Sequence, residues 1–249
     1  MSENGLLVAM IHGVDSTLGK AVALELSRHN VLLVLAAAQT ANCGISGIES
    51  ELSKEGARVV ALDDIGHEAD AEDVSAEALL VRRAGEAFGR LDALVNLCVP
   101  IVATSRQFLR DYPWRLLDRS LAAGRLITGS SKRASVVNHC FMPAMYTGTC
   151  LEQEMPMLKG AITGVTRFLC RKFGPQGLRI NTVQTGFLDM PETKALASPE
   201  VLALKPPVGR WGTPEEVAKL IAFFVVRNGY MTGQAVIMDG GLTAGITGT

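Results

Sequence analysis

Short apolar runs rich in Val, Ile and Leu alternate along the chain with longer segments in which apolar residues recur every three or four positions. Glycine residues stand at many of the joints between them. The short runs predict strands at residues 6–11, 31–37, 58–62, 93–97, 134–138, 179–183 and 234–238. The periodic segments predict helices at residues 18–27, 45–55, 76–88, 105–126, 159–173 and 214–226, with an irregular segment at 186–213. Because the strands are apolar on both faces, we expect a parallel sheet with helices on both sides.

The composition fits one globular α/β domain spanning residues 1–249, and it excludes several classes of partner. The 24 basic and 25 acidic side chains leave a net charge of −1, which gives no electrostatic reason to expect nucleic acid or an anionic membrane. The longest unbroken apolar stretch, Val31 to Ala38, is strand-sized and too short to span a bilayer. The first eleven residues lack the features of a signal peptide, and the five cysteines are an odd number. We therefore expect a reduced, cytoplasmic protein.

The predicted helix at residues 159–173 carries two glycines that bear on its surroundings. Gly160 and Gly164 lie four residues apart and leave a shallow strip along the helix. Glycine inside a helix costs about 1 kcal/mol relative to alanine, so its presence indicates that another backbone approaches closely. Two interpretations remain open at this point: close packing of the helix onto the sheet, or a helix-on-helix contact between subunits.

Several stretches in the second half of the chain resemble the short-chain dehydrogenase/reductase (SDR) family. They are Lys159-Gly-Ala-Ile-Thr-Gly-Val-Thr-Arg167, Phe173-Gly-Pro-Gln-Gly-Leu-Arg-Ile-Asn181, Gly209-Arg-Trp-Gly-Thr-Pro-Glu-Glu-Val217, Tyr230-Met-Thr-Gly233 and Met238-Asp-Gly-Gly241. The first half agrees more loosely, through Gly13, Gly19, Asp64 and the segment that ends at Asn96. The resemblance covers nearly the whole chain. It implies a doubly wound, Rossmann-like parallel sheet of about seven strands, with any ligand at the carboxyl ends of the strands.

The resemblance also implies where a dinucleotide would bind, and the turn after the first strand departs from the family pattern. A phosphate-cradling turn needs glycine because the backbone must come close to the pyrophosphate. Here Thr17 puts a β-branched side chain where a phosphate would pass, and Asp15 adds a negative charge near it. After the second strand, the segment around Ala37 lacks both the acidic residue that binds the ribose of NAD and the basic residue that binds the 2′-phosphate of NADP.

Three further cofactor positions are altered as well. Val99 replaces the glycine beside the nicotinamide ribose, and Thr185 and Met190 stand where the family has a proline and a cofactor-binding threonine. The positions that still match the family are Gly13, Gly19, Asp64 and Asn96. We therefore expect this chain to bind no cofactor.

The residues that transfer protons in this family are Asn, Ser, Tyr and Lys, and the resemblance locates their positions on this chain. Lys159 is retained, but Met155 stands four residues before it, where the tyrosine belongs. A thioether cannot exchange a proton with an alcohol. Leu121 occupies the asparagine position, and the serine position falls at Phe141 or within one residue of it, in a stretch without serine. We therefore expect no catalytic residues of the family type.

Other residues offer different routes to chemistry. Tyr146 lies on the loop that would line the cleft and is a candidate for reaching Lys159. His139 and Cys140 are adjacent, so they point in different directions and form no metal pair; we expect them in the core or lining the cleft. No spacing of ligands along the chain predicts a metal site.

The departures fall on cofactor and proton-transfer positions, whereas the scaffold motifs are kept. We therefore expect a catalytically silent SDR subunit that supports a homologous active subunit in a heterotetramer, and this partner would use NAD to oxidise a secondary alcohol on a CoA thioester. The resemblance implies one subunit interface built by the helices at 105–126 and 159–173, and another built by the C-terminal strand and tail. Two alternatives remain open: an enzyme with altered chemistry that works through Tyr146, Lys159 or Cys140, and a small-molecule binding module that uses the emptied cleft.

Overall fold

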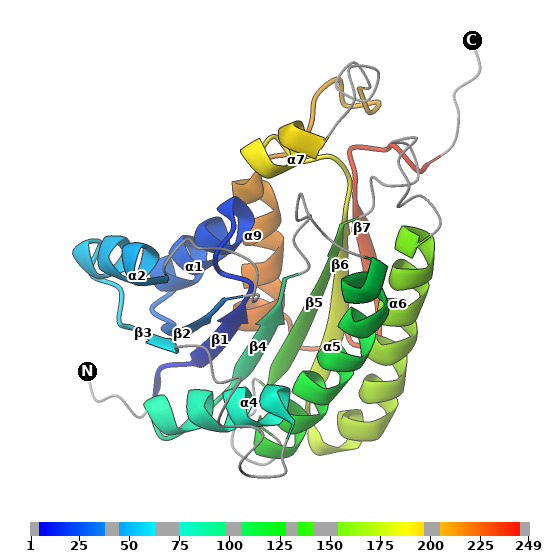
Figure 1. The fold of residues 1–249 in the computed structure, drawn as a ribbon. Helices are drawn as coiled ribbons and strands as arrows, with labels where there is room; N and C mark the ends of the chain where they lie inside the picture. Colours follow the sequence, from blue (N-terminus) through cyan, green and yellow to red (C-terminus); the bar gives the residue numbers. More distant parts are fainter. Residues whose placement is uncertain are drawn as a thin grey trace.

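Seven parallel strands form one sheet at the centre of the molecule, in the order β3-β2-β1-β4-β5-β6-β7 (Figure 1). They are β1 (Val8–His12), β2 (Leu32–Ala36), β3 (Val59–Leu62), β4 (Ala93–Asn96), β5 (Ser135–Phe141), β6 (Arg179–Thr185) and β7 (Ala235–Met238). The computed structural model describes residues 5–37, 45–62, 75–97, 106–127, 134–141, 154–196 and 205–244, with the backbone alone at 106–110, 154–156 and 196. The prediction of a doubly wound sheet of seven strands is confirmed.

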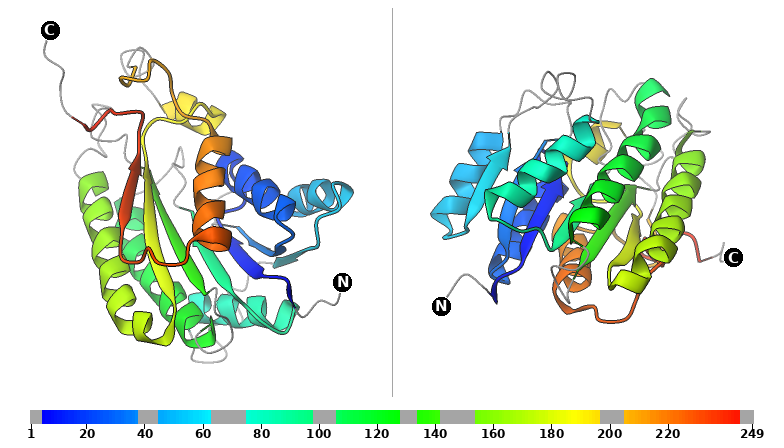
Figure 2. Two further views of the ribbon diagram at one scale, coloured as in Figure 1. Left: turned by 180° about the vertical axis from the view of Figure 1, so that it is seen from behind. Right: turned by 90° about the horizontal axis from the view of Figure 1, so that it is seen from below.

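Helices cover both faces of the sheet, as Figure 2 shows from two further directions. One face carries α1 (Thr17–Arg28), α2 (Ile45–Lys54) and α9 (Pro214–Ala222), and the other carries α4 (Ala76–Ala87), α5 (Arg106–Ile127) and α6 (Glu154–Phe173). Alternate strand residues enter the two cores, so that Ile11 packs beneath α1 and Met10 packs beneath α4 and α5. This explains why the strands are apolar on both faces. No described helix is both long and apolar enough to cross a membrane.

The strand order reverses between β1 and β4, and this fixes the place of any ligand site. β2 and β3 follow on one side of β1, whereas β4 to β7 follow on the other. His12 at the end of β1 is paired in register with Asn96 at the end of β4. Sheets of this kind bind ligands outside the carboxyl ends of the strands at the point of reversal. The candidate site therefore lies around the turn that follows His12.

The structure corrects several predicted boundaries. β1 begins at Val8 rather than at residue 6, and both β5 and β6 continue past their predicted ends to Phe141 and Thr185. α6 begins at Glu154 rather than at 159, because Pro156 falls in its first turn, where a helix needs no N–H donor.

The segment predicted to be irregular, 186–213, contains a short helix, α7 (Pro191–Leu196). The helix predicted for 214–226 is divided: α9 ends at Ala222, and the π-helical turn η4 (Phe223–Arg227) follows it. α9 begins with a capping box in which Thr213 and Glu216 satisfy each other's backbone N–H groups. Hydrogen bonds from Arg210 and then Thr213 lower the pKa of Glu216 to about 2. The start of α9 is thus firmly held beside the segment that carries α7.

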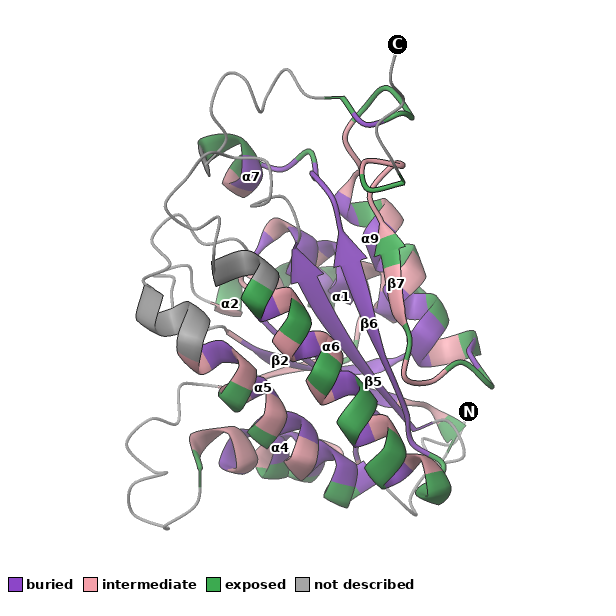
Figure 3. Cartoon of the chain, turned by 90° about the vertical axis from the view of Figure 1, so that its right-hand side faces the viewer, coloured by how far each residue is buried: buried purple, intermediate pink, exposed green. Residues whose placement is uncertain are grey.

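α6 turns an exposed side away from the sheet (Figure 3), and its two glycines are among the exposed residues. Gly160 and Gly164 are exposed, and a Cβ atom built on either would meet nothing within 4 Å. The sheet is contacted instead by the opposite side of α6, through the fully buried Ile162 and Leu169. Close packing of the glycines onto the sheet is therefore wrong, because that interpretation put them on the inward side.

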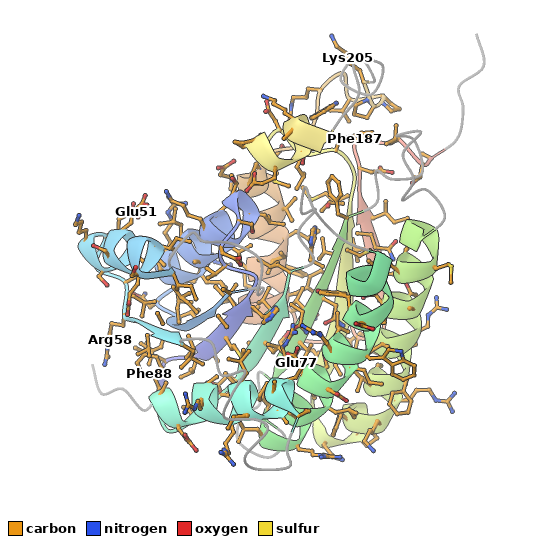
Figure 4. The ribbon with its side chains drawn as sticks, viewed as in Figure 1. Glu51, Arg58, Glu77, Phe88, Phe187 and Lys205 are labelled. Atoms are coloured by element: carbon orange, nitrogen blue, oxygen red, sulfur yellow. The ribbon has the colours of Figure 1, made fainter. Side chains whose placement is uncertain are left out.

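A fully buried arginine joins three elements on the α4–α5–α6 face. The side chain of Arg119, in α5, is 1% exposed. Its Nε donates to Glu77 Oε2 of α4 at 2.7 Å, and its Nη1 donates to Asn96 Oδ1 at the end of β4 at 2.9 Å. Figure 4 labels Glu77 where α4 meets α5. A buried guanidinium is tolerated only when it is paired and hydrogen-bonded in this way.

The same network continues through the sheet to α6. Asn96 Nδ2 lies 2.9 Å from Asn138 Oδ1 of β5, and it also lies 3.2 Å from Ser120 Oγ. Asn138 Nδ2 donates to Thr166 Oγ1 of α6 at 2.9 Å, and Thr166 Oγ1 lies 2.7 Å from Thr182 Oγ1 of β6. Five buried polar residues besides Arg119 are thus satisfied within one chain of contacts. This network fixes α5 and α6 to the sheet in one arrangement.

We expect Glu77→Ala to lower the free energy of unfolding by about 3 to 5 kcal/mol, because it leaves the Arg119 guanidinium buried without its carboxylate. In an Arg119→Met background the same change costs about 1 kcal/mol or less, since no buried charge remains to be compensated. Both values are measured by denaturant unfolding of the native protein, the two single variants and the double variant, which together form a double-mutant cycle. An equal cost in the two backgrounds would show that the ion pair does not couple α4 to α5.

Candidate functional site

The turn between β1 and α1 forms the floor of the candidate site. Gly13 has a φ of +88°, and a Cβ atom there would lie 2.8 Å from the Leu97 carbonyl oxygen. A Cβ atom on Gly19 would lie 2.5 Å from the Gly13 carbonyl oxygen. Both positions therefore require glycine for the chain's own packing, whether or not a ligand approaches. The N–H groups of Gly13 and Val14 are engaged as well, since both donate to the Ala36 carbonyl oxygen.

Two side chains of this protein cap the N-terminus of α1. Ser16 Oγ accepts from the Gly19 N–H at 2.9 Å. The Thr17 N–H donates to Glu192 Oε1 at 2.8 Å, and the Thr17 hydroxyl lies 2.9 Å from both carboxylate oxygens of Glu192. A helix N-terminus attracts anions because its first N–H groups are unpaired and carry a partial positive charge. Here the anion is Glu192, which comes from α7 and lies 175 residues away in the sequence.

The segment that carries Glu192 is held in place from both ends. Gly186 is so close to Asp239 that a Cβ atom on it would lie 2.8 Å from the Asp239 Cα. The Gly212 N–H donates to the Phe187 carbonyl oxygen at 3.0 Å, and the Asp189 N–H donates to the Gly212 carbonyl oxygen at 2.8 Å. The Phe187 ring, labelled beneath α7 in Figure 4, stacks on Trp211 with ring centroids 5.1 Å apart.

Met190 anchors this segment in the core. Its side chain is 1% exposed and belongs to the same apolar cluster as Val14 and Leu18, which flank the glycine turn. A buried thioether at this place offers a phosphate neither a hydrogen-bond donor nor a charge. Residues 186–192, which we call the α7 strap, therefore place Met190 in the core that underlies the turn and Glu192 in contact with the N-terminus of α1.

His12 adds no positive charge to this site. It is buried at the end of β1, and its Nδ1 has no hydrogen-bond partner in the described part of the chain. Burial lowers the pKa of His12 well below its usual value, and the nearby Arg119 and Arg115 lower it further. The imidazole is thus neutral at physiological pH.

The residues of this site do not fit a dinucleotide in the position that such sheets offer. The anion position at α1 holds the Glu192 carboxylate, which would repel a pyrophosphate. Ala36 and Ala37, at the end of β2, present no charged group to a ribose or a 2′-phosphate. Thr185 is buried and lies 2.9 Å, through its Oγ1, from His139 Nε2.

The expected proton-transfer positions are distributed over α5, the end of β5 and α6. Lys159 and Met155 lie one turn apart in α6, and Leu121 of α5 packs partly buried against the neighbouring core. Phe141 turns the other way, into the core beneath α1 and α9. The side chain that β5 presents to α6 at this level is Cys140, which packs against Leu158 and Ile162. The strand end thus offers Lys159 a thiol from the neighbouring position rather than a hydroxyl.

Cys140 is not an activated thiol. It is fully buried, and this burial raises its pKa to about 12, although the nearby Lys159 acts in the opposite direction. The thiol stays protonated at neutral pH, and a thiol in this form is a poor nucleophile. His139 is buried as well, which agrees with the expected core position of both residues. Among the described residues, no group of three or more His, Cys, Asp or Glu is placed to hold a metal ion.

Comparison with known proteins identifies the family. A family model described as enoyl-(acyl carrier protein) reductase matches residues 13–243. The chain belongs to the short-chain dehydrogenase/reductase family. This SDR protein is 31% identical over 245 residues to the subunit BbsC of (2S)-[(R)-hydroxy(phenyl)methyl]succinyl-CoA dehydrogenase of Thauera aromatica, covering 95% of this chain and 94% of that one. It is 26% identical over 246 residues to the subunit BbsD of the same dehydrogenase, covering 94% and 95%.

The fold of this SDR chain also matches solved structures. A short-chain dehydrogenase/reductase from Serratia marcescens superposes with a TM-score of 0.79 at 25% sequence identity, covering 96% of this chain and 98% of the other. The relatives also include a 3-oxoacyl-[acyl-carrier-protein] reductase from Synechocystis that is 26% identical over 245 residues, covering 94% of this chain and 96% of that one. The comparisons thus support an SDR oxidoreductase scaffold.

Three residues singled out in the sequence, Asp64, Val99 and Tyr146, lie outside the described residues. Sequence reasoning missed Glu192, which makes the polar contact that closes the turn. The available signal was its place two residues after Met190, in a segment that the family topology brings to the carboxyl end of β1. That signal predicts only that this segment lies near the carboxyl end of β1. The contact of Glu192 with Thr17 depends in addition on where α7 begins.

We expect Cys140 to resist alkylation by iodoacetamide in the native protein at neutral pH, while the partly exposed Cys170 reacts. A rise of the Cys140 pKa from 9.0 to about 12 lowers its thiolate fraction roughly a thousandfold, and burial also blocks access. Because the raised pKa favours the neutral thiol in the folded state, this contribution to stability is present at neutral pH and is lost as pH rises from about 8.5 toward 12. Peptide mapping by mass spectrometry gives the alkylation rates of Cys140 and Cys170. Rapid modification of Cys140 would show an accessible thiolate.

Proposed function

We propose that this SDR protein is a non-catalytic subunit of a hetero-oligomeric dehydrogenase. It assembles with a homologous subunit that carries the complete Asn, Ser, Tyr and Lys set and binds NAD. The partner oxidises a secondary alcohol, and this chain contributes structure to the assembly rather than chemistry. The proposal goes beyond the SDR oxidoreductase scaffold that the relatives support.

The observation that carries the proposal is the pairing of Met155 with Lys159. The two residues lie one turn apart on α6, which is the spacing of the family's proton-transferring tyrosine and its lysine. Lysine lowers the pKa of that tyrosine, and without a hydroxyl at position 155 the step has no acid or base. Cys140, a buried thiol that feels the charge of Lys159, has its pKa raised to about 12 and therefore stays protonated at neutral pH.

The outward side of α6 supports assembly with a related chain. Met157 is 73% exposed and Phe168 is 53% exposed, and between them lie the exposed glycines Gly160 and Gly164. These four residues, which we call the α6 strip, lie on one side of the helix at three- and four-residue spacing. Because only glycines lie between the large apolar side chains of Met157 and Phe168, another helix can approach α6 closely at this place. A second SDR chain presents the matching helix, because related subunits share the interfaces of the family.

The relatives suggest the substrate class. Two of them, BbsC and BbsD, are named as subunits of one (2S)-[(R)-hydroxy(phenyl)methyl]succinyl-CoA dehydrogenase. We infer a hydroxyacyl-CoA as the substrate of the partner, such as (S)-2-(α-hydroxybenzyl)succinyl-CoA in anaerobic toluene degradation. Because methionine stands at position 155, one turn from Lys159, we infer that this chain is the non-catalytic subunit of such a pair.

The first test isolates the untagged protein from its source cells and identifies by mass spectrometry what elutes with it in fixed proportion. We expect an SDR chain with intact catalytic residues. After reconstitution of the pair, Lys159→Ala in this chain leaves kcat with NAD and the hydroxyacyl-CoA unchanged, whereas Tyr→Phe in the partner abolishes turnover. Loss of turnover on Lys159→Ala, or turnover by this chain alone, would instead favour an enzyme that works through Lys159 and Tyr146.

The second test addresses the α6 strip. We expect Phe168→Glu to abolish co-elution of the two chains, because it places a charge in a desolvated helix contact. Ser53→Glu adds the same carboxylate to the exposed side of α2 and leaves assembly unchanged. Circular dichroism establishes that both variants are folded, and size-exclusion chromatography with light scattering measures the assembly. Full assembly of the Phe168→Glu variant would show that the interface lies on another surface.

A further inference from the structure

The contact between Glu192 and Thr17 lies where a Rossmann-type sheet binds pyrophosphate. We propose that Glu192 is a built-in occupant of this anion position, and that the α7 strap excludes dinucleotides from the chain for as long as it is in place. The inference deepens the proposed non-catalytic role and rests on it, since a silent subunit has no need to open the site. It assigns the exclusion to one side chain rather than to the general loss of family residues.

The contact reproduces the bonds that a phosphate would make. Glu192 accepts the Thr17 N–H at 2.8 Å and lies 2.9 Å from the Thr17 hydroxyl through both carboxylate oxygens. Hydrogen bonds to an ionised acceptor are about twice as strong as neutral ones, and the partial positive charge of the helix end adds to them. The first turn of α1 contains no acidic residue of its own, so the carboxylate from α7 supplies the charge that this end of the helix favours.

The rest of the strap keeps the carboxylate at this place. Met190, two residues earlier, is buried in the same hydrophobic core as Val14 and Leu18, and the backbone hydrogen bonds between residues 187–189 and Gly212 fix the direction of the chain. A group tethered in this way competes at a high effective concentration with any free ligand. A pyrophosphate would therefore have to displace Glu192 and then bind beside its negative charge, which is unfavourable on both counts.

The strap provides a matched control, because a second carboxylate lies on it without reaching α1. Asp189 pairs with Lys194 on the exposed side, where both side chains are 56% exposed. Asp189→Asn thus removes the same charge from the same segment and leaves the Thr17 contact intact. Any effect of net charge on anion binding appears in this variant as well, whereas an effect of the contact itself does not.

The experiment titrates the full-length chain with NAD and with inorganic pyrophosphate by isothermal calorimetry. We expect no saturable binding to the native protein or to Asp189→Asn, and saturable pyrophosphate binding to Glu192→Ala with an affinity about tenfold or more above the limit that the native titration sets. Glu192→Gln, which keeps the size and an acceptor oxygen but loses the charge, gives a smaller gain. Trypsin cleavage after Lys194, followed by intact mass, is faster in Glu192→Ala than in the native protein, because the strap loses its bond to α1.

The outcomes separate this inference from the proposed function. Folded Glu192→Ala and Glu192→Gln proteins that bind pyrophosphate no better than Asp189→Asn, with unchanged cleavage after Lys194, overturn the role of Glu192 and leave the silent-subunit proposal standing. Saturable NAD binding by the native chain at micromolar concentration also overturns it. The proposed function fails separately, through the turnover measurements on Lys159→Ala and on the isolated chain.

Discussion

A guanidinium buried at the middle of the molecule sets the arrangement of half of the structure. Arg119 cannot stay in the apolar interior without partners, and the partners it finds belong to α4 and to the end of β4. Asn96 is hydrogen-bonded in turn to an amide of β5, and the series of amide and hydroxyl hydrogen bonds continues from there to α6 and β6. Moving any one of these elements leaves a buried polar group unpaired. The α6 strip therefore stands on a rigid base, which is what a surface for a second subunit requires.

On the opposite face of the sheet, the placement of the α7 strap depends on how the N-terminus of α1 is capped. In a cofactor-binding SDR protein the ligand completes this helix end, whereas here the polypeptide completes it with Glu192 and with the packing of Met190. On both faces, side chains of the protein thus complete the key polar contacts, Arg119 with Glu77 and Asn96 on one and Thr17 with Glu192 on the other. The retained glycines fit this view, since Gly13 and Gly19 are demanded by backbone contacts alone. A glycine motif at this turn is accordingly compatible with a protein that has no ligand there.

The sequence predicts the sheet well, because buried parallel strands depend on local spacing. Buried strands appear as apolar runs, and a four-residue interval places Met155 one turn from Lys159 on any helix. The rest depends on tertiary placement. The inward side of α6 is set by Ile162 and Leu169, so the glycines face outward, and the parity of β5 turns Phe141 away from Lys159. The Glu192 contact joins residues 175 apart and has no local signature.

Met190 makes the α7 strap part of the hydrophobic core. Because its side chain fills part of that core, threonine at this position would leave a cavity and a buried hydroxyl at a cost of about 2 to 5 kcal/mol. That is a large fraction of the stability of a typical domain. The buried Met190 and the carboxylate at the N-terminus of α1 belong to one segment of the chain. A substitution at Met190 therefore changes the stability of the fold as well as the surface that a ligand would meet.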